Sequence, residues 1–204
     1  MKTNDKPVIM LDFGGVYFTH GRSIGMKRIA RKFMMPEKTV AGSFSGNYYK
    51  KYHEGKAGPA EFWKGVSGKL KISRKQAREM EKIWFSSYVP LREMKQLVRK
   101  LRKKYRVVVL SGNIRERVRY LDRKYRVLKE FHGHHFSFDH GFAKPDVRLF
   151  KSAARKMRLR PAECIVVDDS KEFLEAVKKT GAKTIMFKNA KQLERALRNY
   201  GVHA

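Results

Sequence analysis

The chain is predicted to fold as an α/β protein, in which a Rossmann-like parallel sheet carries helices on both faces and a small all-helical segment is inserted. Its 204 residues, 42% of them apolar, suffice for one core domain with a small insert. Short apolar runs alternate with helical patterns, which is typical of parallel strands joined by helical crossovers. The predicted strands are residues 7–13, 106–110, 164–167 and 183–187.

The helices around this sheet are predicted from apolar residues spaced three and four positions apart. One such pattern covers residues 94–101 behind Pro90, which acts as an N-terminal breaker. A second covers residues 173–177 and stops at Gly181, and a third covers residues 193–200. Helices therefore alternate with strands over most of the chain.

Residues 21–88 interrupt this alternation and are predicted to be entirely helical. One helix begins at Pro59, and another follows Ser73, where the Ser-Arg-Lys-Gln sequence is a capping box. Glycines are predicted to mark turns inside this segment at positions 42, 46, 55, 65 and 68. Its aromatic residues are predicted to form a helical core: Tyr48, Tyr49, Tyr52, Phe62 and Trp63.

The chain is strongly basic, with 48 Lys and Arg against 19 Asp and Glu and a net charge of +29. This charge excludes an acidic solubility tail and makes phosphorylated substrates, nucleic acids and other polyanions natural weak partners. The basic residues are spread along nearly the whole chain, as on a solvated surface. The charge alone therefore predicts no more than non-specific polyanion binding.

The cysteine content and the hydropathy pattern favour a cytoplasmic location. Cys164 is the single cysteine, which excludes an internal disulfide and a zinc site built from several cysteines. No apolar run approaches the roughly 18–20 residues of a membrane helix. The apolar stretch 8–11 is too short for a signal peptide. No membrane partner is expected, and the oligomeric state stays open.

Polar side chains follow three of the predicted strands. Asp12 follows the first and precedes Gly14 and Gly15, whose small size lets the backbone turn tightly near a ligand. Ligands bind at the carboxyl ends of parallel strands, so Asp12 lies at the expected mouth of a site. Asp168 and Asp169 follow the third strand, where two adjacent carboxylates indicate Mg²⁺.

Anion-binding groups are predicted at two further positions. Ser111 ends the second strand and begins a turn with Gly112 and Asn113, whose hydroxyl and backbone N–H groups suit an anion. Lys144 precedes Pro145, where a helix is expected to begin. A lysine beside a helix N-terminus forms an electropositive corner for phosphate.

These groups, in this order on a parallel sheet, resemble the four motifs of the haloacid dehalogenase-like (HAD) hydrolase superfamily over nearly the whole chain. Asp12 matches the nucleophile, Ser111 the second motif, Lys144 the third, and Asp168 with Asp169 the fourth. The resemblance implies a core domain of residues 1–20 and 89–204. Residues 21–88 look like the family's helical cap domain.

The resemblance implies a Mg²⁺-dependent phosphatase that acts on a small phosphorylated metabolite. Asp12 would form an aspartyl-phosphate. Mg²⁺ would be held directly by the Asp12 carboxylate, the Gly14 carbonyl and Asp169. Asp168 would contribute less directly. The phosphoryl oxygens would be held by Gly14, Gly15, Ser111, Gly112, Asn113 and Lys144.

The sequence departs from the family at the position two residues after the nucleophile. Most phosphatases of the family have a general-acid aspartate there, and this chain has Gly14, as some of them do. The family's dehalogenases also lack that aspartate, so a 2-haloacid dehalogenase is the alternative enzyme. A polyanion-binding protein on a degenerate HAD scaffold is the non-enzyme alternative. His20 is a conceivable proton donor, although a loop histidine is favoured.

Three other features of the sequence bear on the predicted site. Gly112 and Phe173 stand where many relatives have asparagine, which weakens the support around the ligands. His132, His134 and His135 have no carboxylate at a metal-binding spacing, so a polar loop is predicted there. The substrate is left undefined because the side chains of the helical segment cannot be placed over the mouth of the site.

Overall fold

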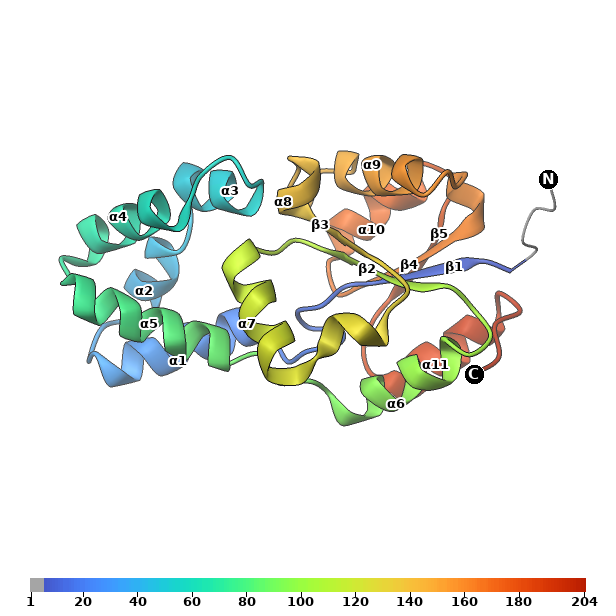
Figure 1. The fold of residues 1–204 in the computed structure, drawn as a ribbon, viewed down its shortest axis with the longest axis horizontal. Coiled ribbons are helices and arrows are strands. Elements are labelled where there is room, and N and C mark those ends of the chain that lie inside the picture. The colour runs from blue at the N-terminus through green and yellow to red at the C-terminus, as the bar shows by residue number, and fades with distance from the viewer. Residues whose placement is uncertain (1–5) are drawn as a thin grey trace.

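The computed structural model describes residues 6–204 and contains a five-stranded parallel sheet in the order β3-β2-β1-β4-β5 (Figure 1). Its strands are β1 (Val8–Leu11), β2 (Val107–Ser111), β3 (His134–Phe136), β4 (Cys164–Asp168) and β5 (Lys183–Met186). The predicted α/β class is therefore confirmed, and the four predicted strands are present with shifts of one or two residues at their ends. Residues 1–5, which the expected core domain includes, lie outside the described residues.

Both faces of the sheet are covered because successive strand residues point to opposite sides. In β1, Ile9 and Leu11 face one apolar cluster, whereas Val8 and Met10 face another. The first cluster is completed by α6 (Arg92–Leu101), α7 (Arg115–Tyr125) and α11 (Ala190–Arg198). The second is completed by α9 (Arg148–Lys156) and α10 (Lys171–Lys178). Figure 1 shows α9 and α10 above the sheet and α6 and α11 below it.

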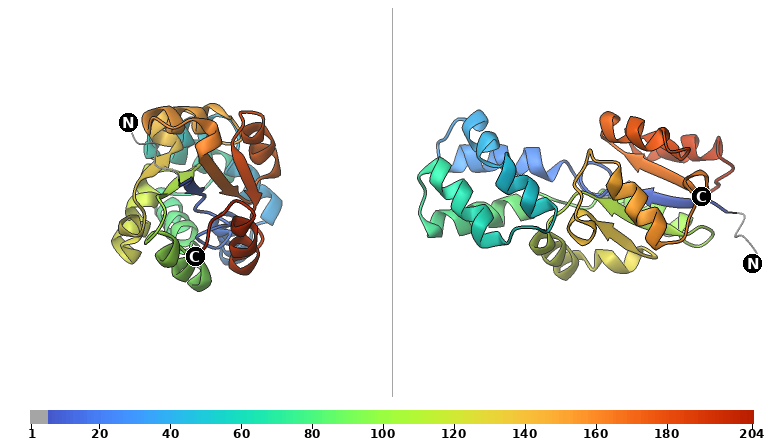
Figure 2. Two further views of the ribbon diagram at one scale, coloured as in Figure 1. Left: turned by 90° about the vertical axis from the view of Figure 1, so that its right-hand side faces the viewer. Right: turned by 90° about the horizontal axis from the view of Figure 1, so that it is seen from above.

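The segment predicted to be helical forms five helices beyond the carboxyl ends of the strands (Figures 1 and 2). They are α1 (Gly21–Lys32), α2 (Glu37–Ser43), α3 (Asn47–His53), α4 (Pro59–Leu70) and α5 (Arg74–Ser86). The predicted capping box is present, since Ser73 Oγ accepts from Gln76 N at 3.3 Å and Gln76 Oε1 accepts from Ser73 N at 2.8 Å. We call these five helices the helical insert.

The shorter elements are η1 (Val127–Glu130), α8 (Ser137–His140) and η2 (Pro161–Glu163). None of the helices within residues 6–204 has the length and apolarity needed to cross a membrane.

The predicted polar loop at the histidines is wrong, because His134–Phe136 forms the edge strand β3. It pairs in parallel with β2, with His135 opposite Leu110. This strand is three residues long and has no apolar run, so its pairing is set by the neighbouring strand rather than by its own composition. His135 is buried as a result, whereas His134 is exposed.

Three of the five glycines predicted to mark turns lie inside helices instead. Gly42 is in α2, and Gly65 and Gly68 are in α4. Gly65 has a packing role, since a Cβ there would lie 2.9 Å from the ring of Tyr48. Gly46 does precede a helix at a φ of 91°, a conformation that glycine adopts readily.

We predict that His135 makes the protein lose stability as the pH falls. Burial lowers its pKa to about 4, and His140, whose Nε2 lies 3.3 Å from His135 Nδ1, adds to the lowering. The unfolded chain keeps a pKa near 6.5 and so binds more protons between pH 6.5 and 4. The free energy of unfolding should therefore fall by about 2 kcal/mol over this range through His135.

Urea unfolding at pH 7 and pH 4 tests this prediction with two variants. His135→Leu should show a smaller fall in stability than the wild type. His134→Gln, which changes an exposed neighbour in the same strand, should retain the full fall. Equal falls in the wild type and His135→Leu would contradict the prediction.

Candidate active site

Three aspartates meet at the carboxyl edge of the sheet. Asp12 follows β1, Asp168 ends β4 and Asp169 comes next in the chain. The strands pair in parallel with Leu11 opposite Val167, so their ends lie side by side. One carboxylate oxygen of each aspartate lies within 4.8 Å of the other two. The fold thus gathers three acids from distant parts of the sequence into one cluster.

Lys144 is the cation inside this cluster. Its Nζ lies 2.9 Å from Asp12 Oδ1 and also donates to Asp168 Oδ2. The ammonium group further lies 5.0 Å from the ring centroid of Phe173, which is fully buried. The aromatic face of Phe173 thus stabilises the Lys144 ammonium group through a cation–π contact. It does so at a position where many relatives are expected to have a polar asparagine side chain.

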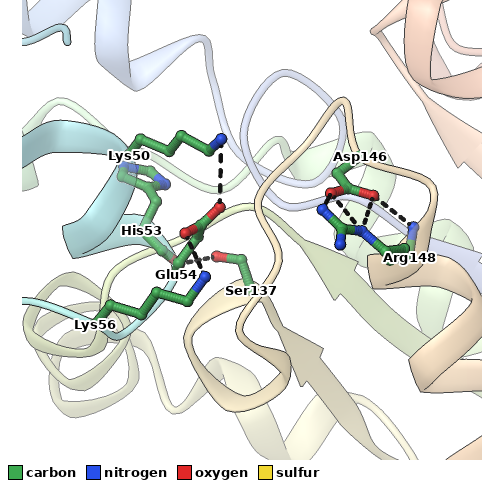
Figure 3. Close-up of polar contacts among 7 residues, drawn as sticks. All are labelled: Lys50, His53, Glu54, Lys56, Ser137, Asp146 and Arg148. Carbon is green, nitrogen blue, oxygen red and sulfur yellow. Dashed lines mark hydrogen bonds and ion pairs between the residues drawn. The ribbon is translucent and has the colours of Figure 1, made fainter. Parts of the chain in front are cut away.

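The helix expected to begin at Pro145 starts three residues later, at Arg148, so Lys144 does not lie at a helix N-terminus. Asp146 accounts for the shift. Its Oδ1 accepts from the Arg148 backbone N at 2.9 Å, and its carboxylate pairs with the Arg148 guanidinium (Figure 3). Lys144 is therefore held in a loop and acts through its own charge rather than through a helix dipole.

The acids outnumber the lysine, and this imbalance shapes the charge state of the cluster. Burial raises the pKa of Asp168, with Lys144 opposing the rise and Asp12 adding to it. Burial also raises the pKa of Asp169, and Asp12 adds to that rise. Burial alone would lower the pKa of Lys144, but the carboxylates of Asp12 and Asp168 outweigh it and raise that pKa. The lysine stays charged while the acids repel each other.

Gly15 is required where the chain passes the acidic cluster. Its φ is 80°, and a Cβ there would lie 2.1 Å from Asp169 Oδ2. Any side chain would therefore displace Asp169. Gly14 lacks this constraint because its φ is outside the left-handed region, and a Cβ there would lie 3.3 Å from Tyr88 Cε1.

The second predicted anion site follows β2. Ser111 is the last residue of that strand and is buried. Gly112 and Asn113 line a cavity of about 270 Å³ beside the aspartates, whereas Ser111 lies behind this lining. Asn113 is fixed by its neighbours, since its backbone N donates to Ser137 Oγ at 3.0 Å.

The cavity lies between the sheet edge and the helical insert. From the sheet side it is lined by Asp12, Gly14, His20, Gly112, Asn113, Arg117 and Asp169. From the insert and its ends it is lined by Gly21, Arg22, Ser23, Tyr49, His53 and Tyr88. The acidic cluster therefore opens into a cleft whose opposite wall is the insert.

Two hydrogen bonds attach the insert to the sheet part of the chain beside this cavity. Ser137 Oγ donates to the backbone oxygen of His53 at 2.5 Å, and Tyr52 OH donates to Glu116 Oε2 at 2.7 Å. Figure 3 shows His53 at the end of α3 facing Ser137, with Glu54 between Lys50 and Lys56. These contacts fix the end of α3 over the site.

The lining includes residues that the sequence analysis did not single out. Arg22, His53, Tyr88 and Arg117 lie on helices or at helix ends, and no motif marks which helical face turns toward a cavity. Tyr49 packs against the core as expected and also lines the cavity, while Tyr52 and Phe62 are buried as expected.

His20 also lies at the cavity rather than in a remote loop. It precedes α1, and its Nδ1 lies 3.3 Å from Asp169 Oδ2. Its side chain is 67% exposed, so it can exchange protons with solvent. An imidazole at this position can deliver a proton to a group bound in the cavity.

The donor set fits a divalent cation with a preference for oxygen. Asp12 Oδ1 is buried beside Lys144 Nζ, which lies 2.9 Å away, and the three carboxylates carry more negative charge than Lys144 balances. Carboxylate oxygens so arranged suit Mg²⁺. Within residues 6–204, no other group of three acids, histidines or cysteines is close enough to hold a metal ion.

A model of the haloacid dehalogenase-like hydrolases matches residues 11–181, which include all of these groups. The chain belongs to this family. The family resemblance of the sequence is therefore confirmed, and the chain is a HAD-like hydrolase.

A curated relative, an uncharacterised protein of Dictyostelium discoideum, is 26% identical over 148 residues. These cover 70% of this chain and 64% of the relative, so this chain matches less than two thirds of the relative's length.

Solved structures share the HAD fold. A HAD family enzyme of Bacteroides thetaiotaomicron, in complex with magnesium and inorganic phosphate, is 24% identical with a TM-score of 0.72, covering 90% of this chain and 94% of that one. A HAD-like hydrolase of Porphyromonas gingivalis is 18% identical with a TM-score of 0.73, covering 98% and 99%. An L-2-haloacid dehalogenase is 16% identical with a TM-score of 0.66, covering 88% and 83%. One structural neighbour thus binds magnesium and inorganic phosphate, and another is a dehalogenase.

We predict that Mg²⁺ stabilises the protein through the acidic cluster. A cation at a hundred times its Kd should add about 2.7 kcal/mol to the free energy of unfolding. Thermal melting with and without Mg²⁺ measures this as a rise in Tm. Asp169→Asn should lose most of the rise, and its metal-free form should melt above the metal-free wild type because a repulsive charge is gone.

Asp139→Asn is the matched control, since Asp139 is an exposed aspartate in α8 outside the cluster. It should keep the full rise in Tm with Mg²⁺. An unchanged Mg²⁺ response in Asp169→Asn would show that the cation binds elsewhere.

Proposed function

We propose that the chain is a Mg²⁺-dependent phosphatase that hydrolyses a small phosphorylated metabolite through an aspartyl-phosphate on Asp12. The observation that carries the proposal is the cluster itself. Asp12, Asp169 and the Lys144 ammonium converge at the edge of the sheet, and the first two open into the cavity. A carboxylate nucleophile beside a cation site and a lysine is the equipment that phosphoryl transfer needs.

The cation would be held by the Asp12 carboxylate, the Gly14 carbonyl and Asp169. Asp168 is less available, because its Oδ1 accepts from Ser170 N at 2.8 Å and its Oδ2 accepts from Lys144. Its role is to orient Lys144. Bound Mg²⁺ supplies charge neutralisation for the phosphoryl group.

The reaction proceeds in two displacements at phosphorus. A carboxylate oxygen of Asp12 forms a bond to phosphorus as the alcohol oxygen leaves with a proton. Water then attacks phosphorus, releasing inorganic phosphate and restoring the Asp12 carboxylate. Lys144, Ser111 and the backbone N–H group of Gly112 hold the phosphoryl oxygens, and Asn113 borders them, since its own backbone N donates to Ser137 Oγ. The insert restricts water in the first step.

The leaving-group proton has to come from a residue other than Gly14. His20 is placed for this task, since it lines the cavity and contacts Asp169.

The insert, residues 21–88, acts as the cap over a core of residues 1–20 and 89–204. The site serves a reaction in the cytoplasm.

Two kinds of support favour phosphate esters over halogenated acids. Magnesium and inorganic phosphate are bound by a structural neighbour, the Bacteroides thetaiotaomicron enzyme. The acidic cluster carries more negative charge than Lys144 balances and so suits a cation, which displacement of a halide does not need. The dehalogenase neighbour keeps a 2-haloacid dehalogenase as the second candidate. Polyanion binding explains the charge of +29 but gives the acidic cluster no role.

Removal of the metal or of the nucleophile should abolish hydrolysis of p-nitrophenyl phosphate. EDTA should stop the reaction reversibly, and Asp12→Asn should lower kcat by at least about 10³-fold, because an amide is a poor nucleophile of similar shape. Asp139→Asn should retain wild-type kcat. Release of halide from 2-chloropropionate in the presence of EDTA would instead establish the dehalogenase.

Gly14→Asp should raise kcat if protonation of the leaving group limits the rate. The gain should reach up to about 10²–10⁴-fold for sugar phosphates, whose alkoxides leave poorly, and should be small for p-nitrophenyl phosphate. The backbone conformation permits the substitution, although Tyr88, 3.3 Å from the new Cβ, has to move slightly.

Gly14→Ala is the matched control, because it adds the Cβ without the carboxyl group and should not raise kcat. An equal change in kcat for both kinds of substrate would show that the missing aspartate is not what limits the rate. Substitution of His20 would then be the next comparison.

A further inference from the structure

We propose that the substrate carries a second anionic group, a carboxylate or a second phosphate, on its alcohol part, and that Arg117 of α7 binds this group together with Arg22 and His53. The inference rests on the proposed phosphatase function and deepens it by naming a substrate class. All three side chains line the cavity that contains Asp12 and Asp169.

Arg117 is a buried cation without an acidic partner. Only 2% of it is exposed, and among residues 6–204 no carboxylate forms an ion pair with it. Its Nε donates to Asn113 Oδ1 at 2.7 Å, while its Nη1 is buried with no hydrogen-bond partner. Arginine is almost never so buried unless an anion pairs with it.

The aromatic residues around Arg117 fix its orientation without neutralising it. Its guanidinium carbon lies 4.5 Å from the ring centroid of Tyr88 and 4.9 Å from that of Trp84. The bond to Asn113 holds the other side. A guanidinium held in this way keeps its remaining N–H groups oriented for a planar or tetrahedral anion.

His53 provides a second unsatisfied group at the same cavity. Its ring is buried, lies 4.3 Å from the Tyr49 ring centroid at a tilt of 37°, and leaves Nε2 without a hydrogen-bond partner. Burial lowers the pKa of His53, and the charges of Arg117 and Arg22 add to the lowering, so its ring is neutral. A neutral imidazole can donate one hydrogen bond to an anion that the two arginines attract.

Arg22 enters the cavity from the first turn of α1. Its Nη2 donates to the Phe44 backbone oxygen at 3.0 Å, and its guanidinium lies 5.3 Å from the Tyr49 ring centroid. It too forms no ion pair with a carboxylate in the described part of the chain. The cavity lining therefore combines two acids, Asp12 and Asp169, with two arginines, Arg22 and Arg117, that form no ion pair with them in the described part of the chain.

This division of charge sets what the cavity can bind. The acids suit a cation and the phosphoryl group that the cation neutralises. The two arginines, which no carboxylate neutralises, are left for a different negative charge on the same molecule. A volume of about 270 Å³ suits a small ester, so the second anion is assigned to a small phosphorylated acid or a small bisphosphate.

The test compares pairs of esters that differ in the second anion. The carboxylate pair is 3-phosphoglycerate against glycerol 3-phosphate. The phosphate pair is the bisphosphate of propane-1,3-diol against its monophosphate. In the wild type, kcat/KM for the doubly anionic member of at least one pair should exceed that of its partner by about 10–100-fold, the range of a charge-assisted hydrogen bond. The pair with the larger ratio identifies the anion.

Variants of the two arginines show which side chain causes the preference for the doubly anionic ester. Arg117→Met should bring the ratio close to 1, and Arg22→Met should lower it in part. Arg119→Met is the control, because Arg119 is exposed two residues further along α7 and should leave the ratio unchanged. Thermal melting establishes that each variant is folded. If Arg117→Met does not fold, the subsite is tested by the kcat/KM ratios of the wild type and Arg22→Met.

The outcomes separate this inference from the proposed function. Hydrolysis of p-nitrophenyl phosphate with ratios near 1 for both pairs overturns the anion subsite and leaves the phosphatase standing. A ratio that Arg117→Met and Arg22→Met do not lower also overturns it. If no ester is hydrolysed, the proposed function fails, and the anion subsite is then tested by ligand binding, measured as a rise in Tm. Glycerate should raise Tm more than glycerol in the wild type but not in Arg117→Met, and equal shifts overturn the subsite.

Discussion

The convergence of three carboxylates on one lysine is the constraint on which the rest of the site depends. The parallel pairing of β1 with β4 brings Asp12 beside Asp168 and Asp169, and Lys144 reaches them from the loop before α9. One ammonium group cannot balance three acids, so burial and repulsion raise the pKa values of Asp168 and Asp169. A divalent cation at this cluster, as proposed, would balance the excess negative charge. The architecture of a hydrolase of this family thus follows from how the strand ends meet.

The helical insert turns an acidic edge into a selective cavity. Ser137 and Tyr52 attach the end of α3 to the sheet part of the chain, and this contact encloses the space above Asp12. The enclosed wall contributes cationic and neutral polar groups rather than acids. With acids and unpaired arginines in one lining, the proposed doubly anionic ester would place one anion at the nucleophile and the other at Arg117.

The sequence predicts what depends on strand order and local pattern. Apolar runs ending in Asp12, Ser111 and Asp168 were sufficient to place the parallel sheet, and Ser73 was sufficient to place a helix start. The edge strand β3 could not be predicted, because its two histidines carry no strand pattern and the pairing comes from β2. Arg117 could not be predicted as part of the site either. Its burial depends on Tyr88 and Trp84 from the distant insert, which no local spacing reveals.

The central claim is that the carboxylate of Asp12 takes the phosphoryl group from the substrate. The most direct measurement is rapid acid quenching during turnover of p-nitrophenyl phosphate with Mg²⁺, followed by mass spectrometry of the peptide that contains Asp12. The account predicts a transient peptide heavier by one phosphoryl group, with the modification on Asp12, which decays as inorganic phosphate appears. Release of phosphate at the same rate with Asp12 unmodified throughout turnover would contradict it.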